Sequence, residues 1–272
     1  MRWGALPVLV VQLACLDAPP GEADDLGPIC QEFGEWSEPA DVPGLETVEG
    51  ASPTVSGDGS LIMWETLEDA LQTARWNGTR FEPLTDELTA EINTRASERN
   101  PTLSASGLTV WFTRGPTSDP TLYVSTRGSL DESFPVALPV SGIDMVFEGA
   151  DVWDDGGQLF FSILVDEQWE LASATCSAPD VCSYQGVLDT LTSPLSEQYP
   201  SIRSDGLEMI YNDQSGNSLL AVERSTGSDE FLATEELRFQ AYDPDLVADG
   251  SRMYMQLENH LLVSTRSCLD EE

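Results

Sequence analysis

The chain has 272 residues, and its 48 Asp and Glu residues against 12 Arg and no Lys give a formal net charge of −36 at pH 7. A field this negative repels the phosphates of nucleic acids and the anionic head groups of lipids, which excludes both as direct partners. Because the acidic residues are dispersed rather than clustered, we interpret the charge mainly as a solubility feature. Affinity for cations or for a basic partner is the functional alternative.

The first 14 residues resemble a bacterial signal peptide. Arg2 supplies a positive charge, and residues 6–14 form a mostly apolar run that is far shorter than the about 20 residues needed to span a bilayer. The run ends in QLAC, which resembles a lipobox, so Cys15 is the candidate for lipidation. Ordinary signal cleavage and an uncleaved, buried segment are the alternatives.

A tether is predicted to follow the signal peptide. Residues 16–29 are rich in Pro, Gly and acidic residues and show no apolar periodicity, which is typical of a solvated linker. We therefore expect a flexible tether over residues 15–32, a folded domain over 33–268 and a short tail over 269–272.

Five blocks of seven residues superimpose without gaps within the predicted domain. Each block begins with Pro, or with Ala in the third block, and has an apolar third residue and a Gly at its seventh position. The blocks are PTVSGDG (53–59), PTLSASG (101–107), ADVWDDG (150–156), PSIRSDG (200–206) and PDLVADG (244–250). Repetition at an interval of about 40–50 residues is typical of the blades of a β-propeller.

Each repeat predicts four antiparallel strands. Gly in the Asp-Gly or Ser-Gly pair tolerates positive φ, so the block forms a hairpin turn. In the fourth repeat, alternating apolar runs follow at EMIYN (208–212) and SLLAVE (218–223), and a weaker fourth strand is exemplified by RFEPL (80–84). The sequence thus predicts an all-β protein, a five-bladed β-propeller of four-stranded antiparallel blades around a narrow central channel.

The fifth repeat lacks its fourth strand, because only residues 267–272 follow HLLVSTR (260–266). The segment FGEWSEPA (33–40) resembles the fourth strands, in which an aromatic residue precedes Pro. We infer that this N-terminal strand pairs in the last blade and closes the ring. Closure of this kind removes exposed sheet edges.

The block P-x-[LIV]-S-x-D-G, followed by an apolar strand and by LYVSTR (122–127), resembles the WD40-like, or PD40, repeat of TolB-like propellers. The resemblance covers residues 33–268. It implies a propeller in the bacterial cell envelope, on the periplasmic side or at the outer membrane, as in many envelope lipoproteins. The chain shows five repeats rather than the six of TolB and has no room for the additional N-terminal domain of TolB, so the partner of TolB is not implied.

The cysteines predict two disulfides. If Cys15 is lipidated, four cysteines remain in an exported chain, where the compartment is oxidising. Cys176 and Cys182 lie six residues apart in one connection and are expected to form a local bridge. Cys30 precedes the closing strand and Cys268 follows the third strand of the last repeat, so this pair is expected to lock the ring. Four free thiols are the alternative.

Signals for catalysis are sparse. The sequence has one His, His260, and it contains no GxSxG, no GxxxxGK and no dinucleotide-binding Gly fingerprint. Acidic residues near the predicted innermost strands are the candidates for a glycosidase-type acid and base. They are Glu148, Asp151, Asp243 and Asp245.

Other polar residues have simpler interpretations. We expect Asp58, Asp205 and Asp249, which precede the turn glycines, to accept hydrogen bonds within their turns. The loop NDQSGNS (212–218) could bind calcium, but a polar hairpin loop is the stronger interpretation. The sequon at Asn77 would matter only in a glycosylating host. No metal site and no cofactor are assigned.

The sequence therefore predicts a noncatalytic, monomeric cell-envelope lipoprotein whose propeller binds an envelope protein or glycan. Its only attachment to the membrane is the lipid anchor, and its contact face is expected at the loops of one end of the ring. The alternative is a glycan-active hydrolase that uses carboxylates at the axial channel. Acids converging with Trp or Arg at the axis would favour the enzyme, and a plugged axis would favour the binding protein.

Overall fold

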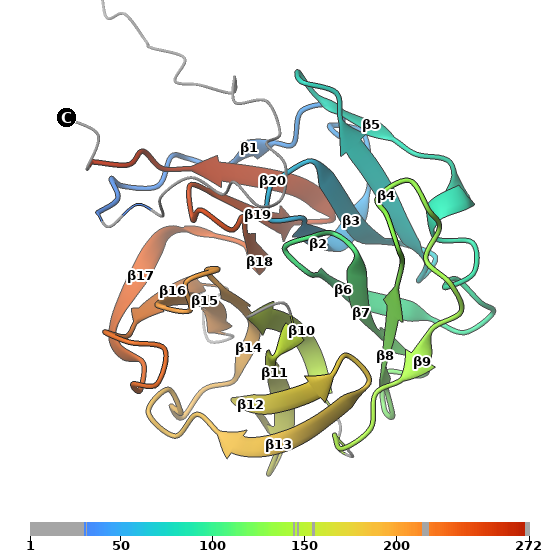
Figure 1. Ribbon diagram of the computed structural model, residues 1–272. Coiled ribbons are helices and arrows are strands. Elements are labelled where there is room, and N and C mark those ends of the chain that lie inside the picture. The colour runs from blue at the N-terminus through green and yellow to red at the C-terminus, as the bar shows by residue number, and fades with distance from the viewer. Residues whose placement is uncertain are drawn as a thin grey trace, which may run out of the picture.

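The computed structural model describes residues 30, 32–143, 145, 147–153, 156–213 and 218–269. Their strands form five four-stranded antiparallel sheets arranged around a common axis (Figure 1). The predicted five-bladed β-propeller is therefore confirmed. Within the described ranges, no helix is long and apolar enough to cross a membrane.

The first four blades each use four consecutive strands, ordered from the axis outward. Blade 1 contains β2 (Gly50–Val55), β3 (Leu61–Thr66), β4 (Leu71–Trp76) and β5 (Phe81–Pro83), and blade 2 contains β6 (Glu98–Leu103), β7 (Thr109–Arg114), β8 (Thr121–Thr126) and β9 (Leu138–Pro139). Blade 3 contains β10 (Phe147–Trp153), β11 (Gln158–Val165), β12 (Gln168–Ala178) and β13 (Val181–Val187), and blade 4 contains β14 (Glu197–Ile202), β15 (Glu208–Asp213), β16 (Ser218–Glu223) and β17 (Leu232–Gln240). The 3-10 helix η1 (Asp86–Leu88) lies in the connection between blades 1 and 2.

Blade 5 joins the two ends of the described chain. Its strands are β18 (Tyr242–Leu246), β19 (Arg252–Leu257), β20 (His260–Thr265) and the N-terminal β1 (Ala40–Asp41), which pairs antiparallel with β20. Ahead of β1, the backbone N–H of Ser37 donates to Thr265 at 2.8 Å and that of Gly34 to Ser267 at 2.9 Å. The N-terminal segment thus closes the ring as predicted. Its regular strand is shorter than the predicted 33–40, in part because Pro39 has no N–H to donate.

Both predicted disulfides are present. Cys30 and Cys268 are bonded with their Cα atoms 5.6 Å apart, next to the bridge between Phe33 and Cys268 that begins the closing strand. Cys176 and Cys182 are bonded with a Cα separation of 3.9 Å and face each other directly in β12 and β13. The first disulfide therefore links the two chain ends where the ring closes, and the second links the two strands of one hairpin.

The turn of each repeat has the predicted chemistry. All five repeat glycines adopt positive φ, between 67° at Gly107 and 90° at Gly156. A carboxylate oxygen of the preceding Asp accepts the N–H of the residue two positions on, at 2.9 Å for Asp58, 2.9 Å for Asp205 and 2.8 Å for Asp249. The expectation that these Asp residues serve their turns is confirmed.

A stack of Arg on Phe supports the outer part of three blades. At or near the end of each third strand, one residue donates its backbone N–H to the residue that follows the turn glycine. In order, the donors are Trp76, Arg127, Cys176, Arg224 and Arg266. The guanidinium lies over a Phe ring at 4.3 Å for Arg127, 4.5 Å for Arg224 and 3.8 Å for Arg266. A Trp76–Phe81 ring contact takes this place in blade 1, and the Cys176–Cys182 disulfide takes it in blade 3.

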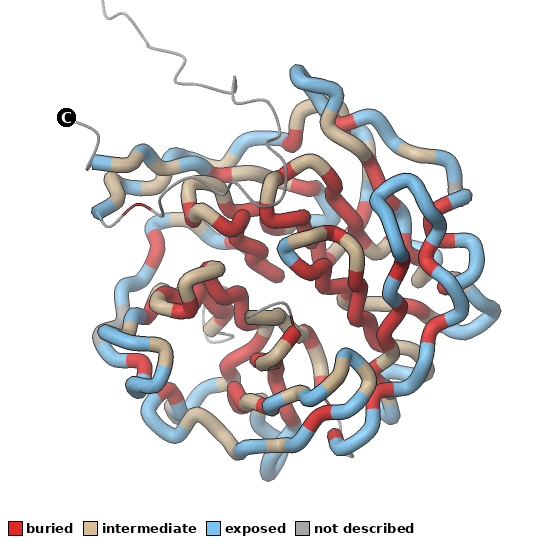
Figure 2. The backbone as a smooth tube through the Cα atoms, in the orientation of Figure 1, coloured by how far each residue is buried: buried red, intermediate tan, exposed pale blue. Residues whose placement is uncertain are grey.

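The core lies near the axis and between neighbouring blades. Figure 2 shows buried backbone along the inner strands and exposed backbone around the outer rim. One cluster joins Met63 and Leu71 of blade 1 to Val110 and Phe112 of blade 2. Aromatic and branched residues on the facing surfaces of twisted sheets therefore hold adjacent blades together.

Candidate functional site

The inner strands share an unusual backbone conformation at the axis. The residue directly before the first residue of each repeat block has positive φ, between 46° and 53°, and these residues are Ser52, Asn100, Gly149, Tyr199 and Asp243. Four of them carry a side chain, and for such residues this region is sparsely populated. Each strand bulges at this point, since its pairing register with the next strand shifts there. The bulges bring all five residues to the wall of one axial pocket.

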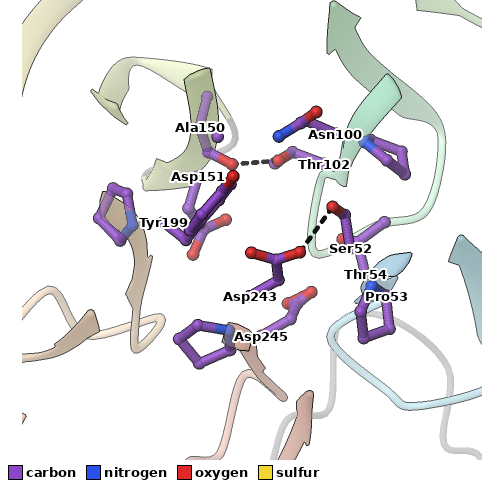
Figure 3. A pocket seen from close by; sticks show the side chains of 14 residues that line it. Ser52, Pro53, Thr54, Asn100, Thr102, Ala150, Asp151, Tyr199, Asp243 and Asp245 are labelled. Carbon is purple, nitrogen blue, oxygen red and sulfur yellow. Dashed lines mark hydrogen bonds between the residues drawn. The ribbon is translucent and has the colours of Figure 1, made fainter. Parts of the chain in front are cut away.

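The axial pocket is small. Residues from all five inner strands line it, and its volume is about 30 Å³ (Figure 3). A water needs about 10–15 Å³ measured in this way, so the pocket holds one to three waters. Sites for organic ligands span roughly 300–1,000 Å³, about ten to thirty times the volume of this pocket.

A closed ring of hydrogen bonds joins the blades at the axis. The side chain of the second residue of each block forms a hydrogen bond with the neighbouring blade. Thr54 accepts the backbone N–H of Leu103 at 3.0 Å, and Asp151 accepts the backbone N–H of Ile202 at 2.7 Å. Ser201 accepts the backbone N–H of Leu246 at 2.9 Å, and Asp245 accepts the backbone N–H of Val55 at 2.9 Å. Thr102 completes the ring by donating its hydroxyl to the carbonyl of Ala150. At this position, a hydroxyl or a carboxylate therefore forms the hydrogen bond that a buried backbone group of the neighbouring blade needs.

A second tier of bonds involves side chains of the second strands. Side-chain oxygens there accept the N–H of the left-handed residue in the next blade: Glu65 from Asn100 at 3.2 Å, Ser162 from Tyr199 at 3.0 Å, and Asn212 from Asp243 at 2.9 Å. This tier holds the bulged residues in place.

The four predicted acids have different surroundings. Asp151, Asp243 and Asp245 converge on the axial pocket, whereas Glu148 is not among its lining residues. One oxygen of Asp243 accepts the hydroxyl of Ser52 at 2.9 Å, and its other oxygen is buried without a partner. Glu148 instead accepts the side-chain amide of Gln198 at 3.1 Å.

Burial shifts the acids of the axis toward their neutral forms. It raises the pKa of Asp151 and of Asp243 to about 7 in each case. Burial first, and the nearby Asp151 second, raise the pKa of Asp245 well above its usual value. Burial also raises the pKa of Glu148, and it raises that of Glu65 to about 7. No Arg is among the described residues that line the pocket, and Arg99 only partly offsets the raised pKa of Glu148 and of Glu65.

Sequence reasoning missed Tyr199, Ser52 and Glu65. Tyr199 lies in the pocket wall, and burial raises its pKa well above the usual value. A usable signal was present for two of them, because Ser52 and Tyr199 both directly precede the repeat Pro. Glu65 carried no such signal, since its bond to Asn100 joins different blades.

The remaining candidates lie away from the axis. His260 is exposed at the start of β20 and makes an isolated bridge with Glu49. Residues 214–217 of the proposed calcium loop, and Cys15 with the predicted signal peptide, fall outside the described residues. In the part of the chain that is described, no three or more His, Cys, Asp and Glu side chains are grouped to hold a metal ion.

The fold and this site define a five-bladed β-propeller whose inner strands are joined by bonds between the blades and enclose an axial pocket of only about 30 Å³. No family model matches the chain, and no curated protein resembles it in sequence. Assignment to the PD40 repeat therefore stays a prediction, while the five-bladed β-propeller fold is confirmed.

Solved structures that resemble the chain have varied functions. A family 117 glycoside hydrolase from Zobellia galactanivorans matches with a TM-score of 0.64 and 10% identity, over 88% of this chain and 92% of that one. A gluconolactonase from Xanthomonas campestris matches with a TM-score of 0.50 and 11% identity, over 79% and 71%. A putative TolB from Agrobacterium tumefaciens matches with a TM-score of 0.49 and 14% identity, over 75% and 68%. At these identities the likeness concerns the fold alone.

Proposed function

We propose that this chain is a noncatalytic binding propeller of the bacterial cell envelope, which contacts a protein or a glycan through its outer surfaces. The observation that carries the proposal is the small volume of the axial pocket. A pocket of about 30 Å³ cannot admit a sugar ring together with an attacking water. Binding must then take place on the loops or between the blades, where recognition surfaces of rigid scaffolds usually lie.

The roles of the axial acids support this interpretation. Asp151 and Asp245 occupy the repeat position that Thr54 and Ser201 fill in other blades, and all four accept a backbone N–H from the next blade. In blade 2, Thr102 at the same position donates to the carbonyl of Ala150, so the position requires a polar side chain, which need not be an acid. A glycosidase needs one carboxyl group on each side of a scissile bond, with free access to the substrate.

One observation favours the alternative, a glycan-active hydrolase. Asp151 and Asp243 line the same pocket, and both have a pKa raised to about 7, which suits a general acid at neutral pH. A hydrolase of this kind would have to open the ring of hydrogen bonds before a substrate could enter.

The proposed location is the cell envelope, with Cys15 as the lipid anchor of a monomer. Two disulfides fit an oxidising compartment, and the N-terminal sequence fits export. Cys15→Ser followed by cell fractionation tests the anchor: the variant should leave the membrane fraction and lose its acyl label.

A panel of polysaccharides tests the absence of catalysis. We expect no turnover from the native chain at pH 5 to 8, and capture from envelope extracts should yield a stable partner. Turnover that disappears in both Asp151→Asn and Asp243→Asn would instead establish the hydrolase.

A further inference from the structure

A large groove separates blade 4 from the segment that closes the ring. Its volume is about 860 Å³, within the range of ligand sites. One side consists of residues 32–38, which lead into β1, and the other consists of β16, β17 and the turn around Glu208. These two parts of the chain lie near each other on one side of the ring in Figure 1.

The floor of the groove is apolar. Trp36, Ala221 and Phe239 line it, are half-buried and pack against the hydrophobic cluster between blades 4 and 5. Partly exposed aromatic surface at the bottom of a cleft is typical of interface anchors.

The rim of the groove is acidic. Six exposed carboxylates border it: Glu32, Glu35, Glu38, Glu223, Glu235 and Glu236. The exposed basic residue of the same rim is Arg238, which pairs with Glu35 at 3.1 Å while both side chains remain about four-fifths exposed. The rim therefore carries a net negative charge toward solvent.

Two of the three arginines in the wall are paired with carboxylates inside it, and the third, Arg224, donates to the carbonyl of Gly206 and lies over the ring of Phe231. Arg203 donates to Asp205 and to the buried Glu208, and Arg266 donates to the same Glu208. Arg266 also lies over the rings of Phe33 and Trp36, at 3.8 and 4.3 Å. Since their charges are already paired inside the wall, these two residues have little effect on a ligand in the groove.

We propose that this groove binds a basic, amphipathic segment of a partner protein, with apolar side chains on the floor and Lys or Arg side chains against the rim. The proposal rests on the binding function proposed above and specifies its site and the class of its partner. The argument is the charge complementarity between a cationic segment and a rim of six carboxylates over an apolar floor.

Two observations favour a polypeptide over a sugar. Arg266 covers a face of Trp36, which reduces the ring surface open to a sugar. The outermost strand of blade 4, β17, has nine residues, against seven in β13 and two or three in the other blades. Its backbone therefore offers an extended edge on which a peptide strand can add.

The chain's own residues 16–29 are a poor match for the groove. Their charged residues are Asp17, Glu22, Asp24 and Asp25, so the acidic rim repels them.

The experiment uses the chain from residue 16 onward and a fluorescein-labelled ten-residue peptide that alternates Lys with Leu and Phe. We expect saturable binding by fluorescence anisotropy that weakens with added salt. A peptide with Glu in place of Lys, and one with Ser in place of Leu and Phe, should each bind at least tenfold more weakly.

Variants locate the binding site. Glu223→Gln combined with Glu235→Gln should weaken binding about tenfold, because each exposed charge contributes a fraction of a kcal/mol. Ala221→Arg, which fills the floor with a cation, should weaken it at least tenfold. Glu87→Gln combined with Glu91→Gln removes two exposed charges outside the groove and should change binding less than twofold.

Several outcomes would overturn the proposal. Equal weakening by the two Gln pairs would show attraction to the overall charge rather than to the groove. Binding of maltohexaose or chitohexaose that is lost in the groove variants, without peptide binding, would make the groove a glycan site. A large gain in peptide affinity on deleting residues 16–29 would identify that segment as the occupant. None of these results concerns turnover, so the proposed noncatalytic function is tested separately.

Discussion

The axial channel and the groove beside blade 4 use the same residue type in opposite ways. At the axis, Asp151 and Asp245 are enclosed and bind backbone N–H groups across blade boundaries. At the groove, Glu223 and Glu235 point to solvent around an apolar floor. The comparison teaches that the repeat position of an acid indicates its role. An acid that shares its position with Thr or Ser in other blades is structural, whereas an acid of the rim is free to meet a partner.

The two regions also differ in what holds them together. Every blade contributes to the axis, so its five-fold bonds support one another. The groove depends on one segment, residues 32–38, which the Cys30–Cys268 disulfide and a short strand attach to β20.

Removing the Cys30–Cys268 disulfide should have the largest effect on stability. Cys268→Ser opens a loop spanning 238 residues in sequence, so it should lower the free energy of unfolding by about 5.5 kcal/mol on the chain-entropy model. Cys182→Ser opens a loop of six and should cost about 2 kcal/mol. Urea unfolding without reductant measures both. Equal losses would mean that the strands, rather than this disulfide, hold the ring closed.

Removing an acceptor at the axis should have the next largest effect. Asp245→Ala leaves the N–H of Val55 buried without a partner, which should cost about 1–3 kcal/mol. Asp245→Asn keeps an oxygen in place and should differ from the native chain by less than about 1 kcal/mol. If the Asn variant loses as much stability as the Ala variant, then the carboxylate itself is required, and the structural interpretation is wrong.

Stability should decrease as pH rises toward neutrality. The folded chain holds protons on Asp151 and Asp243 up to a pKa of about 7, whereas the unfolded chain releases them near pH 4. Between these values the folded state binds more protons, so the free energy of unfolding falls with rising pH. Each such group contributes about 1.4 kcal/mol for each pH unit over which it differs.

Thermal unfolding at pH 5 and pH 8 measures this dependence. The native chain should melt at a higher temperature at pH 5, and Asp243→Asn should reduce the difference by stabilising the protein at pH 8. A melting temperature that rises from pH 5 to pH 8 would contradict the assignment of these shifts.

Changes at the groove rim should have the smallest effect on stability. Glu223→Gln combined with Glu235→Gln removes two exposed charges, so the free energy of unfolding should change by less than about 0.5 kcal/mol. Chemical denaturation measures this value. A larger loss would show that the rim supports blade 4 instead of remaining free for a partner.

Much of the fold was predictable because its signals are local. The spacing of Pro and Gly in each block determines where the chain turns, and the turn aspartates act on residues two positions away. The incomplete fifth repeat also predicted the closure of the ring. The pairing of Cys30 with Cys268 followed from that closure, because the residues that precede the closing strand then lie beside the residues that follow β20.

The candidate site was less predictable. The sequence correctly predicted that Asp151, Asp243 and Asp245 lie near the axis. It did not predict that Asp151 and Asp245 form hydrogen bonds with the next blade. These bonds join residues about 50 or 190 positions apart, across sheets that pack without a sequence signal. The same holds for the Arg–Phe stacks, which local periodicity does not reveal.

By itself, the sequence determined the number of blades, the antiparallel strands, the turns and the disulfide pairing, because each depends on local spacing or on counting repeats. Only the tertiary structure decided that the axial pocket is small and that a large groove lies beside blade 4. Packing five twisted sheets around an axis buries the inner polar residues, which must then pair across blades. Where residues 32–38 cross beside β17, packing is incomplete, and the acids there remain exposed to solvent.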